Sequence, residues 1–469
     1  MGKDDLKKKR LVIIGGGPGG YVAAIRGAQS GFSVIVIEER KLGGTCLHRG
    51  CIPTKSIISS VELIDKIKKG KDFGLKIPDE IGFDLQKIIE RKDKIVGSLT
   101  KGIKGLFKSY GIEVVEGKAS LLDVNRVKAV LNSGEERTIP ADNIIIAAGS
   151  RPSIIPNIVP DGNNIITSDE AVNLTDLPEK MLIIGGGVIG CEFAFIFNIL
   201  GVDITIVELL PDILSTEDED IQSIMKRELK KRKIRLFTEV KVEKIEKKEE
   251  NIITYLSNGE AITVDKVLVS IGRAFNVEGL GLEKIGVAQG KNGVILVDER
   301  METNIKGIYA IGDVVGNILL AHVASAEGKV AVENIAGNDT TMDYSIIPAG
   351  IFTFPEIGSV GIREREAKEK GIAINVGRFQ FRGLGKSQAM GEITGLVKII
   401  SDASSNRILG AHIVGCHATD LIHEIALAIQ IGAKGKDIAN MIHSHPTLSE
   451  GIMEAAEDIY GLSIHLPKK

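Results

Sequence analysis

The chain has 469 residues, of which 43% are hydrophobic and 26% charged, a composition typical of a folded globular protein. Such a length exceeds what one hydrophobic core supports and predicts about three domains. The formal net charge of −3 creates no broad field that would attract nucleic acid or an acidic membrane, so neither is expected as a partner.

Targeting signals are not expected. The opening "MGKDDLKKKR" has no apolar segment before the first predicted strand, which argues against a secretory signal. The most apolar window, residues 181–210, is interrupted by Glu192 and by glycines, so it is not expected to span a membrane. Four cysteines do not make a disulfide framework, and a cytoplasmic location is therefore predicted.

Two long segments of the chain repeat each other. "LVIIGGGPGGYVAAIRGAQSGFSVIVIEE" at 11–39 and "MLIIGGGVIGCEFAFIFNILGVDITIVEL" at 181–209 each predict strand, glycine turn, helix, strand and a terminal acid. Gly15 to Gly185 and Glu38 to Glu208 are both separated by 170 residues. Two such repeats predict two Rossmann-like dinucleotide-binding domains.

Each glycine of the repeat has an expected role. The first of each set permits the tight turn, the second lets the backbone approach a pyrophosphate, and the third lets helix pack on strand. These residues are Gly15, Gly17 and Gly20, and Gly185, Gly187 and Gly190. Glu38 and Glu208 are expected to accept hydrogen bonds from ribose hydroxyls, and Glu208 would repel a 2′-phosphate, which favours NAD over NADP.

The first repeat carries an insertion. Residues 112–151 and 234–273 form a second matching pair, in which Gly149 and Gly272 are 123 residues apart. Since 170 − 123 = 47, the first copy is 47 residues longer, and the extra length starts near "GGTCLHRGCIPTK" at 43–55.

The rest of the chain has a different pattern. "TNIKGIYAIGDVVG" at 303–316 predicts a strand ending near Asp313, which could cap the helix expected at 319–336 or hold a ligand hydroxyl. From about residue 345, alternating strands precede two helices without any glycine fingerprint, which predicts an α+β domain. Two lysine-rich stretches, 226–235 and 241–251, are expected to be a solvated helix face and a hairpin edge.

Cys46 and Cys51 could form a metal site, a structural disulfide or a redox pair. No second Cys/His pair at ligand spacing follows them, and a disulfide closing so small a loop in a reducing compartment contributes little. A redox pair fits better, because Cys51 is predicted near a helix N-terminus and Lys55 adds positive charge one turn later. Cys191 and Cys416 are expected to be packing residues.

A dithiol beside two dinucleotide sites requires an electron relay. A nicotinamide exchanges hydride, whereas thiols exchange two electrons through a mixed disulfide. A flavin connects the two chemistries, so one fold is expected to hold FAD and the other NAD.

Six motifs resemble those of the pyridine nucleotide–disulfide oxidoreductases, in family order and spacing along the whole chain. They are "GGYVAAIRGAQSG", "GGTCLHRGCIPTK", "GGGVIGCEFA", "AIGDVVG", "LLAHVASAEG" and "HSHPTLSEGI". The resemblance is strongest to members that oxidise dihydrolipoyl groups. It implies an α/β chain with an FAD-binding domain (1–152), an NAD-binding domain (153–273), a central segment completing the FAD domain (274–344) and an α+β dimerisation domain (345–469).

The resemblance also implies individual roles. Cys46 would be the interchange thiol that meets substrate, Cys51 would be the charge-transfer thiol at the flavin, and Lys55 and Glu192 would pair near the flavin. The other expected cofactor contacts are Glu38, Gly117, Asp313 and Ala321 for FAD, and Glu208, Val240, Gly272 and Arg273 for NAD. Two residues differ from the pattern, because His48-Arg49 stands where many members carry Asn-Val.

A histidine near the carboxyl end completes the expected site. Thr447-Leu-Ser-Glu450 reads as a helix capping box, which needs no catalysis. The resemblance makes His445 the general base, oriented by Glu450, and places it in the partner subunit's active site, so a homodimer is expected. His443 is interpreted as a packing or interface residue and His322 as a residue at the flavin edge.

The expected function is NAD-dependent oxidation of dihydrolipoyl groups on the lipoylated carrier domains of a multienzyme complex. Two alternatives are a reductase of another small disulfide and a non-enzymatic flavoprotein subunit. The intact set of Cys46, Cys51 and His445 argues against the second.

Overall fold

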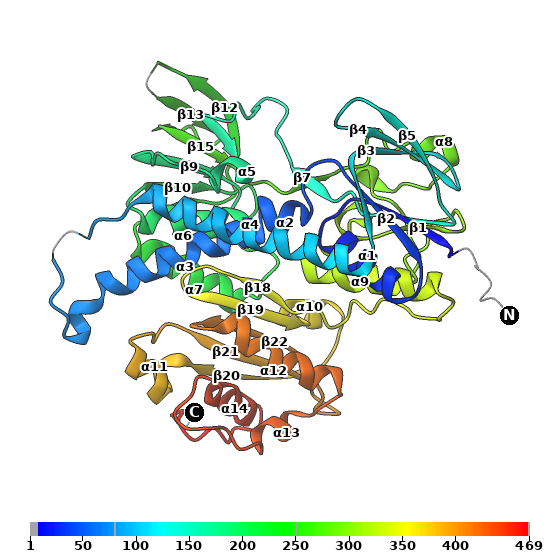
Figure 1. Ribbon diagram of the computed structural model, residues 1–469. Helices are drawn as coiled ribbons and strands as arrows, with labels where there is room; N and C mark the ends of the chain where they lie inside the picture. The colour runs from blue at the N-terminus through cyan, green and yellow to red at the C-terminus, as the bar shows by residue number, and fades with distance from the viewer. Residues whose placement is uncertain (1–7, 79–80, 250, 468–469) are drawn as a thin grey trace. The chain divides into compact units, whose positions relative to one another are not determined.

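The computed structural model describes residues 8–78, 81–249 and 251–467 (Figure 1). The chain separates into two compact units. The first contains residues up to Ser153 with 168–176 and 272–343, and the second contains 154–167, 177–271 and residues from Tyr344 onward. The expected domain boundaries at 152, 273 and 344 stay a prediction, and the targeting prediction falls largely on residues 1–7, outside the described part.

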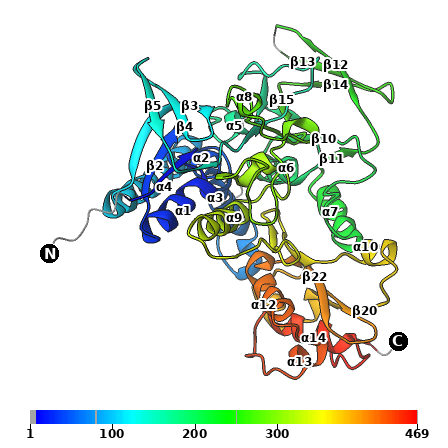
Figure 2. The same cartoon turned by 90° about the vertical axis from the view of Figure 1, so that its right-hand side faces the viewer.

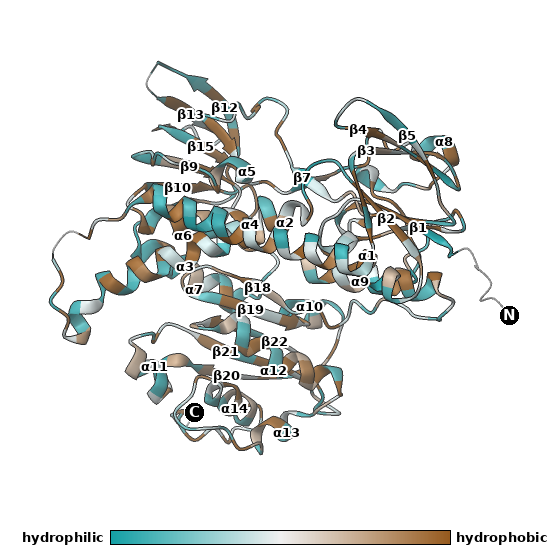
Figure 3. Ribbon diagram, viewed as in Figure 1, coloured by the Kyte–Doolittle hydropathy of each residue, from teal (hydrophilic) through white to brown (hydrophobic). Residues whose placement is uncertain are grey.

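The first unit is built on a seven-stranded sheet in the order β17-β6-β1-β2-β3-β4-β5. The strands are β1 (Arg10–Ile14), β2 (Ser33–Glu38), β3 (Glu113–Asp123), β4 (Arg126–Leu131), β5 (Glu136–Pro140), β6 (Asn143–Ile146) and β17 (Ile308–Ala310). The first five in sheet order pair in parallel and the last two antiparallel. β1 and β2 are apolar and largely brown in Figure 3, as expected for buried parallel strands.

Helices cover this sheet and form the insertion. α1 (Pro18–Gln29) packs against α9 (Ala321–Ile335), and the insertion folds as α2 (Gly44–His48), α3 (Cys51–Lys68) and α4 (Leu85–Tyr110). α4 has ordinary boundaries: Asp84 accepts a bond from the Lys87 amide, and Gly111 ends the helix in a left-handed conformation. The shorter elements of this unit are η1 (Gly70–Phe73), β7 (Ser150–Pro152), α5 (Ser168–Ala171), β16 (Arg273–Phe275), α8 (Leu282–Ile285), η2 (Lys291–Gly293) and η3 (Gly312–Val315).

The second unit begins with a parallel sheet in the order β11-β10-β9-β15-β8. Its strands are β8 (Ile165–Thr167), β9 (Lys180–Ile184), β10 (Asp203–Val207), β11 (Arg235–Phe237) and β15 (Lys266–Val269). Helices α6 (Val188–Ile199) and α7 (Glu219–Lys231) connect these strands, and a small antiparallel sheet contains β12 (Val242–Lys247), β13 (Ile252–Leu256) and β14 (Ala261–Val264).

The carboxyl-terminal part of this unit is the expected α+β fold. Its antiparallel sheet has the order β18-β19-β22-β21-β20. The strands are β18 (Ala349–Ile351), β19 (Glu356–Gly361), β20 (Ile374–Gln380), β21 (Leu396–Asp402) and β22 (Ile408–Gly415). α12 (Ala418–Gln430) packs against β19 and β22, while α14 (Glu450–Asp458) packs against β20 and β21 (Figure 2). The remaining helices are α10 (Glu364–Glu369), η4 (Phe381–Gly383), α11 (Gly385–Met390) and α13 (Gly435–Ala439).

Two polar networks lie inside the second unit. The Lys398 side chain is 2% exposed and binds Asp218 at 2.7 Å and Asp220 at 2.8 Å, which ties β21 to the start of α7. On α14, the Glu454 side chain is 3% exposed; its Oε1 lies 2.6 Å from Nδ1 of His465. Its Oε2 accepts bonds from the Ser463 hydroxyl and from the amides of Ile464 and His465, so Glu454 holds the end of the described chain.

Among the described residues, no helix combines the length and hydrophobicity needed to cross a bilayer.

Candidate active site

The two glycine turns have the same conformation. Gly15 has φ +102° and Gly185 has φ +107°, a region that favours glycine. A Cβ on Gly20 would lie 1.9 Å from the carbonyl oxygen of Gly15, and one on Gly190 would lie 1.9 Å from that of Gly185. The expected turn and packing roles of these four glycines are therefore confirmed.

The acid that ends each repeat holds its own glycine turn. Glu38 accepts bonds from the amides of Gly16 at 2.7 Å and Arg40 at 2.8 Å. Glu208 does the same with the amides of Gly186 at 2.5 Å and Leu210 at 2.7 Å. Each carboxylate oxygen has a second lone pair, so both acids keep acceptor capacity for a ribose hydroxyl.

The middle glycines test whether a dinucleotide fits. Among the described residues, a Cβ on Gly187 would meet nothing within 4 Å, and a Cβ on Gly17 would meet only Cα of Gly44, at 3.9 Å. The protein's own packing therefore does not require glycine at either position. A pyrophosphate that approaches the helix N-terminus does require it, so the two turns fit the expected FAD and NAD.

The inserted helices bring the two cysteines together. α3 begins at Cys51, as expected, and Cys46 lies in α2. They do not form a disulfide, and a hydrogen bond between their side chains raises the pKa of Cys46, with burial adding to the effect. The positive charge of Lys55 opposes that shift. The two sulfurs thus lie within reach of each other, which is the arrangement of a reduced dithiol.

The unusual residues between the cysteines have partners of their own. Nε2 of His48 lies 2.9 Å from the carbonyl oxygen of Leu42, and burial lowers the pKa of this imidazole. Nε of Arg49 lies 3.4 Å from Oδ2 of Asp169. Both side chains point to partners other than the two sulfurs.

Asp313 does not cap a helix. α9 begins at Ala321 without a side-chain cap, so the structural alternative for Asp313 is wrong. Its carboxylate instead accepts a bond from the Ser150 hydroxyl and lies 3.7 Å from Nε of Arg273. Arg273 also donates to the Ser150 hydroxyl at 2.6 Å. Sequence reasoning missed Ser150, for which no motif provided a signal.

The other expected cofactor contacts are spread over both units. Gly117 lies on β3, where a Cβ would be 2.4 Å from the carbonyl oxygen of Val130, so sheet packing alone explains this glycine. Val240 donates its amide to the carbonyl oxygen of Glu208 at 3.1 Å and is therefore beside it. Gly272 has φ +115° at the start of the last segment of the first unit. Glu192 is buried in the second unit and accepts a bond from the Phe352 amide at 2.9 Å.

The expected general base and its orienting acid are paired. Nδ1 of His445 lies 2.8 Å from Oε1 of Glu450, and Oε2 of Glu450 accepts a bond from the Thr447 amide at 2.7 Å. The Thr447 hydroxyl bonds to the Ser444 carbonyl oxygen instead of completing a capping box. The capping interpretation is thus confirmed only for the acid, which serves the turn and the imidazole together. The His445 side chain is 76% exposed.

Another histidine lies two residues earlier on the same loop. The His443 side chain is 3% exposed and binds Glu424 on α12. Sequence reasoning did not find this contact, because the partner lies in another helix. Of the other cysteines, Cys191 is fully buried, as expected of a packing residue, and burial raises its pKa. Cys416 packs at the edge of the carboxyl-terminal core.

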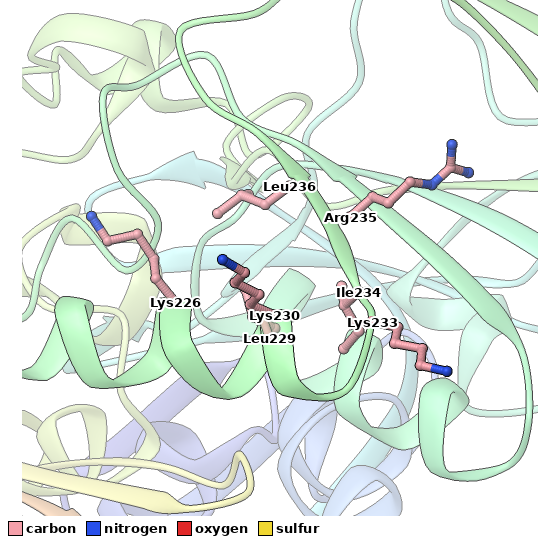
Figure 4. A pocket seen from close by; sticks show the side chains of 7 residues that line it. All are labelled: Lys226, Leu229, Lys230, Lys233, Ile234, Arg235 and Leu236. Carbon is pink, nitrogen blue, oxygen red and sulfur yellow. The ribbon is translucent and has the colours of Figure 1, made fainter.

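A hollow of about 450 Å³ lies at the carboxyl end of α7 (Figure 4). Lys226, Lys230, Lys233 and Arg235 surround it and are all exposed. Lys226 binds Asp212 at 2.5 Å, and positive side chains at a helix carboxyl end offset its dipole. The expected solvated helix face is confirmed.

Known proteins resemble this chain over nearly its whole length. Residues 9–328 match the model of the pyridine nucleotide-disulphide oxidoreductases, and residues 347–456 match the dimerisation domain of that family. The dihydrolipoyl dehydrogenase of Chlamydia muridarum is 43% identical, covering 97% of this chain and 98% of the relative. That of Geobacillus stearothermophilus is 41% identical, covering 98% and 97% respectively.

Solved structures agree. The crystal structure of LpdA from Mycobacterium tuberculosis has a TM-score of 0.91 at 29% identity, covering 96% of this chain and 99% of that one. The HOCl-induced flavoprotein disulfide reductase RclA from Escherichia coli has a TM-score of 0.85 at 25% identity, covering 96% and 99% respectively. The chain belongs to the pyridine nucleotide-disulphide oxidoreductases.

Proposed function

We propose that this enzyme oxidises dihydrolipoyl groups carried by partner proteins and uses NAD as the final electron acceptor. The observation that carries the proposal is the contact between the Cys46 and Cys51 thiols at the start of α3, inside an insertion on a dinucleotide-binding fold. The names of the relatives, all dihydrolipoyl dehydrogenases at 41–43% identity, support this substrate over another small disulfide.

The chemistry starts at the exposed histidine. Since Glu450 occupies Nδ1 of His445, the other ring nitrogen, Nε2, is the one available to accept a proton from a substrate thiol. The thiolate attacks the sulfur of Cys46 in the oxidised pair, which forms a mixed disulfide and releases Cys51 as a thiolate. The second substrate thiol then displaces Cys46, so the substrate closes its disulfide and the Cys46–Cys51 pair gains two electrons.

The reduced pair must be reoxidised. FAD, the flavin used by this family, supplies the two-electron exchange between the dithiol and NAD when it is bound. The open space at Gly17 and Gly187 supports one dinucleotide at each turn. We assign Lys55, Gly117, Asp313 and Ala321 with Glu38 to the FAD site and Glu192 to its edge; Val240, Gly272 and Arg273 are assigned with Glu208 to the NAD site.

The chain is a homodimer through its dimerisation domain. We propose that His445 of one subunit serves Cys46 of the other. Lipoylated carrier domains of a multienzyme complex are the proposed partners. The cytoplasm is the proposed location, because the cysteine pairs that cycle through a disulfide in a reducing compartment are usually catalytic.

A comparison of substrates tests the function. The purified holoenzyme is assayed with dihydrolipoamide and NAD, and in reverse with NADH and lipoamide, glutathione disulfide or coenzyme A disulfide. Turnover of the lipoyl compound at least about a hundredfold above the other disulfides is expected, because an enzyme discriminates between substrates by how well it binds their transition states. Cys46→Ser controls for thiol-independent activity. Faster turnover of glutathione or coenzyme A disulfide would replace the proposed substrate.

A further inference from the structure

The loop that carries His445 is anchored by a second histidine–carboxylate pair, in which the histidine is buried. Nδ1 of His443 lies 3.0 Å from the carbonyl oxygen of Met441, and Nε2 lies 3.1 Å from Oε1 of Glu424. The His443 side chain is 3% exposed and that of Glu424 27% exposed. This pair connects the loop after α13 to the middle of α12.

Both partners of the His443 ring are hydrogen-bond acceptors. A ring N–H donates to at least one of them, so the ring is held between the carbonyl oxygen of its own loop and the carboxylate of α12. Because the His443 side chain is buried, removal of Glu424 would leave a buried ring nitrogen without its hydrogen-bond partner. Residues 443–447 therefore start from a rigid point on α12.

The His443–Glu424 and His445–Glu450 pairs are linked through this loop. Burial alone would raise the pKa of Glu450, yet its pKa is lowered, through the Thr447 amide, His445 and the charge of His443. Glu450 in turn orients the imidazole of His445. Glu450 also accepts a bond from the Thr447 amide, so the acid that holds the base is bonded to the same loop that His443 anchors at its start.

We propose that His443, held by Glu424, is a positioning residue for the His445–Glu450 pair in thiol–disulfide exchange. This inference rests on the proposed function. His443 does not touch the reacting sulfurs in this role; it fixes the start of the loop through its contacts with Glu424 and the Met441 carbonyl oxygen. A packing role alone would require the shape of the side chain but not its link to Glu424.

The test compares the two halves of the reaction in the FAD-loaded dimer. His443→Gln, Glu424→Gln and the double variant are assayed for kcat and KM with dihydrolipoamide and NAD. The same preparations are assayed for NADH-dependent reduction of an artificial dye, which does not need the base. His423→Gln, an exposed neighbour of Glu424 on α12, is the matched control.

Each single variant should lose about ten- to a hundredfold in kcat with dihydrolipoamide, because a misplaced catalytic group costs this much. Dye reduction and dimer content should stay within about twofold, and the double variant should be no worse than the singles, since both remove one interaction. His423→Gln should match the wild type.

Three results overturn the inference: full dihydrolipoamide turnover in both single variants, an equal loss in both assays, or additive losses in the double variant. If His443→Gln does not fold, Glu424→Gln alone tests the inference, by the same comparison of dihydrolipoamide turnover with dye reduction. A wild-type protein that reduces dye but does not turn over dihydrolipoamide refutes the proposed function itself, a result distinct from loss in the variants.

Discussion

Nδ1 of His445 lies 2.8 Å from Oε1 of Glu450, so a carboxylate at the start of α14 fixes the direction in which the imidazole faces. The same acid holds the Thr447 amide through its other oxygen. One side chain therefore fixes both the conformation of the turn and the orientation of the imidazole ring. Its replacement should lower catalytic activity more than it lowers the stability of the fold.

His445→Gln should lower kcat with dihydrolipoamide by about 10²- to 10⁴-fold, the usual contribution of a general base. Glu450→Gln keeps a bond but loses its charge, and about a tenfold loss is expected, equivalent to about 1.4 kcal/mol. Steady-state kinetics of both variants beside NADH–dye reduction measures these effects. If Glu450→Gln is as active as the wild type, the carboxylate of Glu450 has no role in catalysis.

Mixed dimers test the sharing of sites between subunits. Cys46→Ser and His445→Gln homodimers should each be nearly inactive. If subunits assort at random on co-expression, about half of the dimers are mixed, and each of these has one site with both lesions and one with neither. Activity should then return to about a quarter of the wild-type level. Verified mixed dimers without any recovery would place both residues within one subunit's site.

Glu208 should determine the choice between NAD and NADP. Glu208→Ala removes the ribose acceptor and the repulsion of a 2′-phosphate, so the ratio of kcat/KM for NAD to that for NADP should fall, by about tenfold or more. The variant also loses the acceptor for the Gly186 and Leu210 amides, which weakens both cofactors alike and cancels in the ratio. If this ratio stays the same in Glu208→Ala, a residue other than Glu208 determines the choice between NAD and NADP.

The carboxyl-terminal segment should show a pH window. The bonds from Ser463 and His465 lower the pKa of Glu454 although burial opposes this, and the bond to Glu454 raises the pKa of His465. Because the pKa of Glu454 is lowered in the folded state, its carboxylate stabilises the segment above about pH 4.5, and this stabilisation is lost as the pH falls through the folded pKa. Because the pKa of His465 is raised in the folded state, its protonated imidazole stabilises the segment fully below about pH 6.5, and this stabilisation is lost as the pH rises through the folded pKa.

Protection of the Ile464 and His465 amides against hydrogen exchange, corrected for intrinsic rates, should therefore be greatest between about pH 4.5 and 6.5. His465→Gln should remove the decline on the alkaline side. The effect is expected to be small and salt-dependent, because the His465 side chain is 67% exposed. Protection that keeps rising toward pH 9 in the wild type would contradict it.

Sequence patterns over a few residues predicted the turns and helix starts that depend on neighbouring residues alone. The glycine turns at Gly15 and Gly185 and the start of α3 at Cys51 follow from residue type and spacing, and the structure places them as expected. The 26-residue helix α4 was not predicted, although Asp84 and Gly111 are ordinary boundary signals. The insertion was recognised by its length alone.

Contacts between distant segments could not be predicted in this way. His443 and Glu424 are 19 residues apart on different elements, and Lys398 lies 180 residues from Asp218. Nothing in a local window determines such partners, because they depend on how the sheets and helices pack. The role of Asp313 was left open for the same reason, since Ser150 and Arg273 come from other parts of the chain.

The middle glycines of the two turns have different surroundings. Gly44, at the start of the inserted α2, lies beside Gly17: a Cβ on Gly44 would be only 2.6 Å from Cα of Gly17. In the part of the chain that the structure describes, nothing lies within 4 Å of a Cβ on Gly187. The insertion that carries the thiols thus lies against the middle glycine of the first turn, and among the described residues no segment lies as close to the middle glycine of the second. A nucleotide at the first turn should leave slowly and survive purification, whereas one at the second should exchange in every catalytic cycle. The insertion would then separate a prosthetic group from a cosubstrate by residence time, although the two turns share the same chemistry.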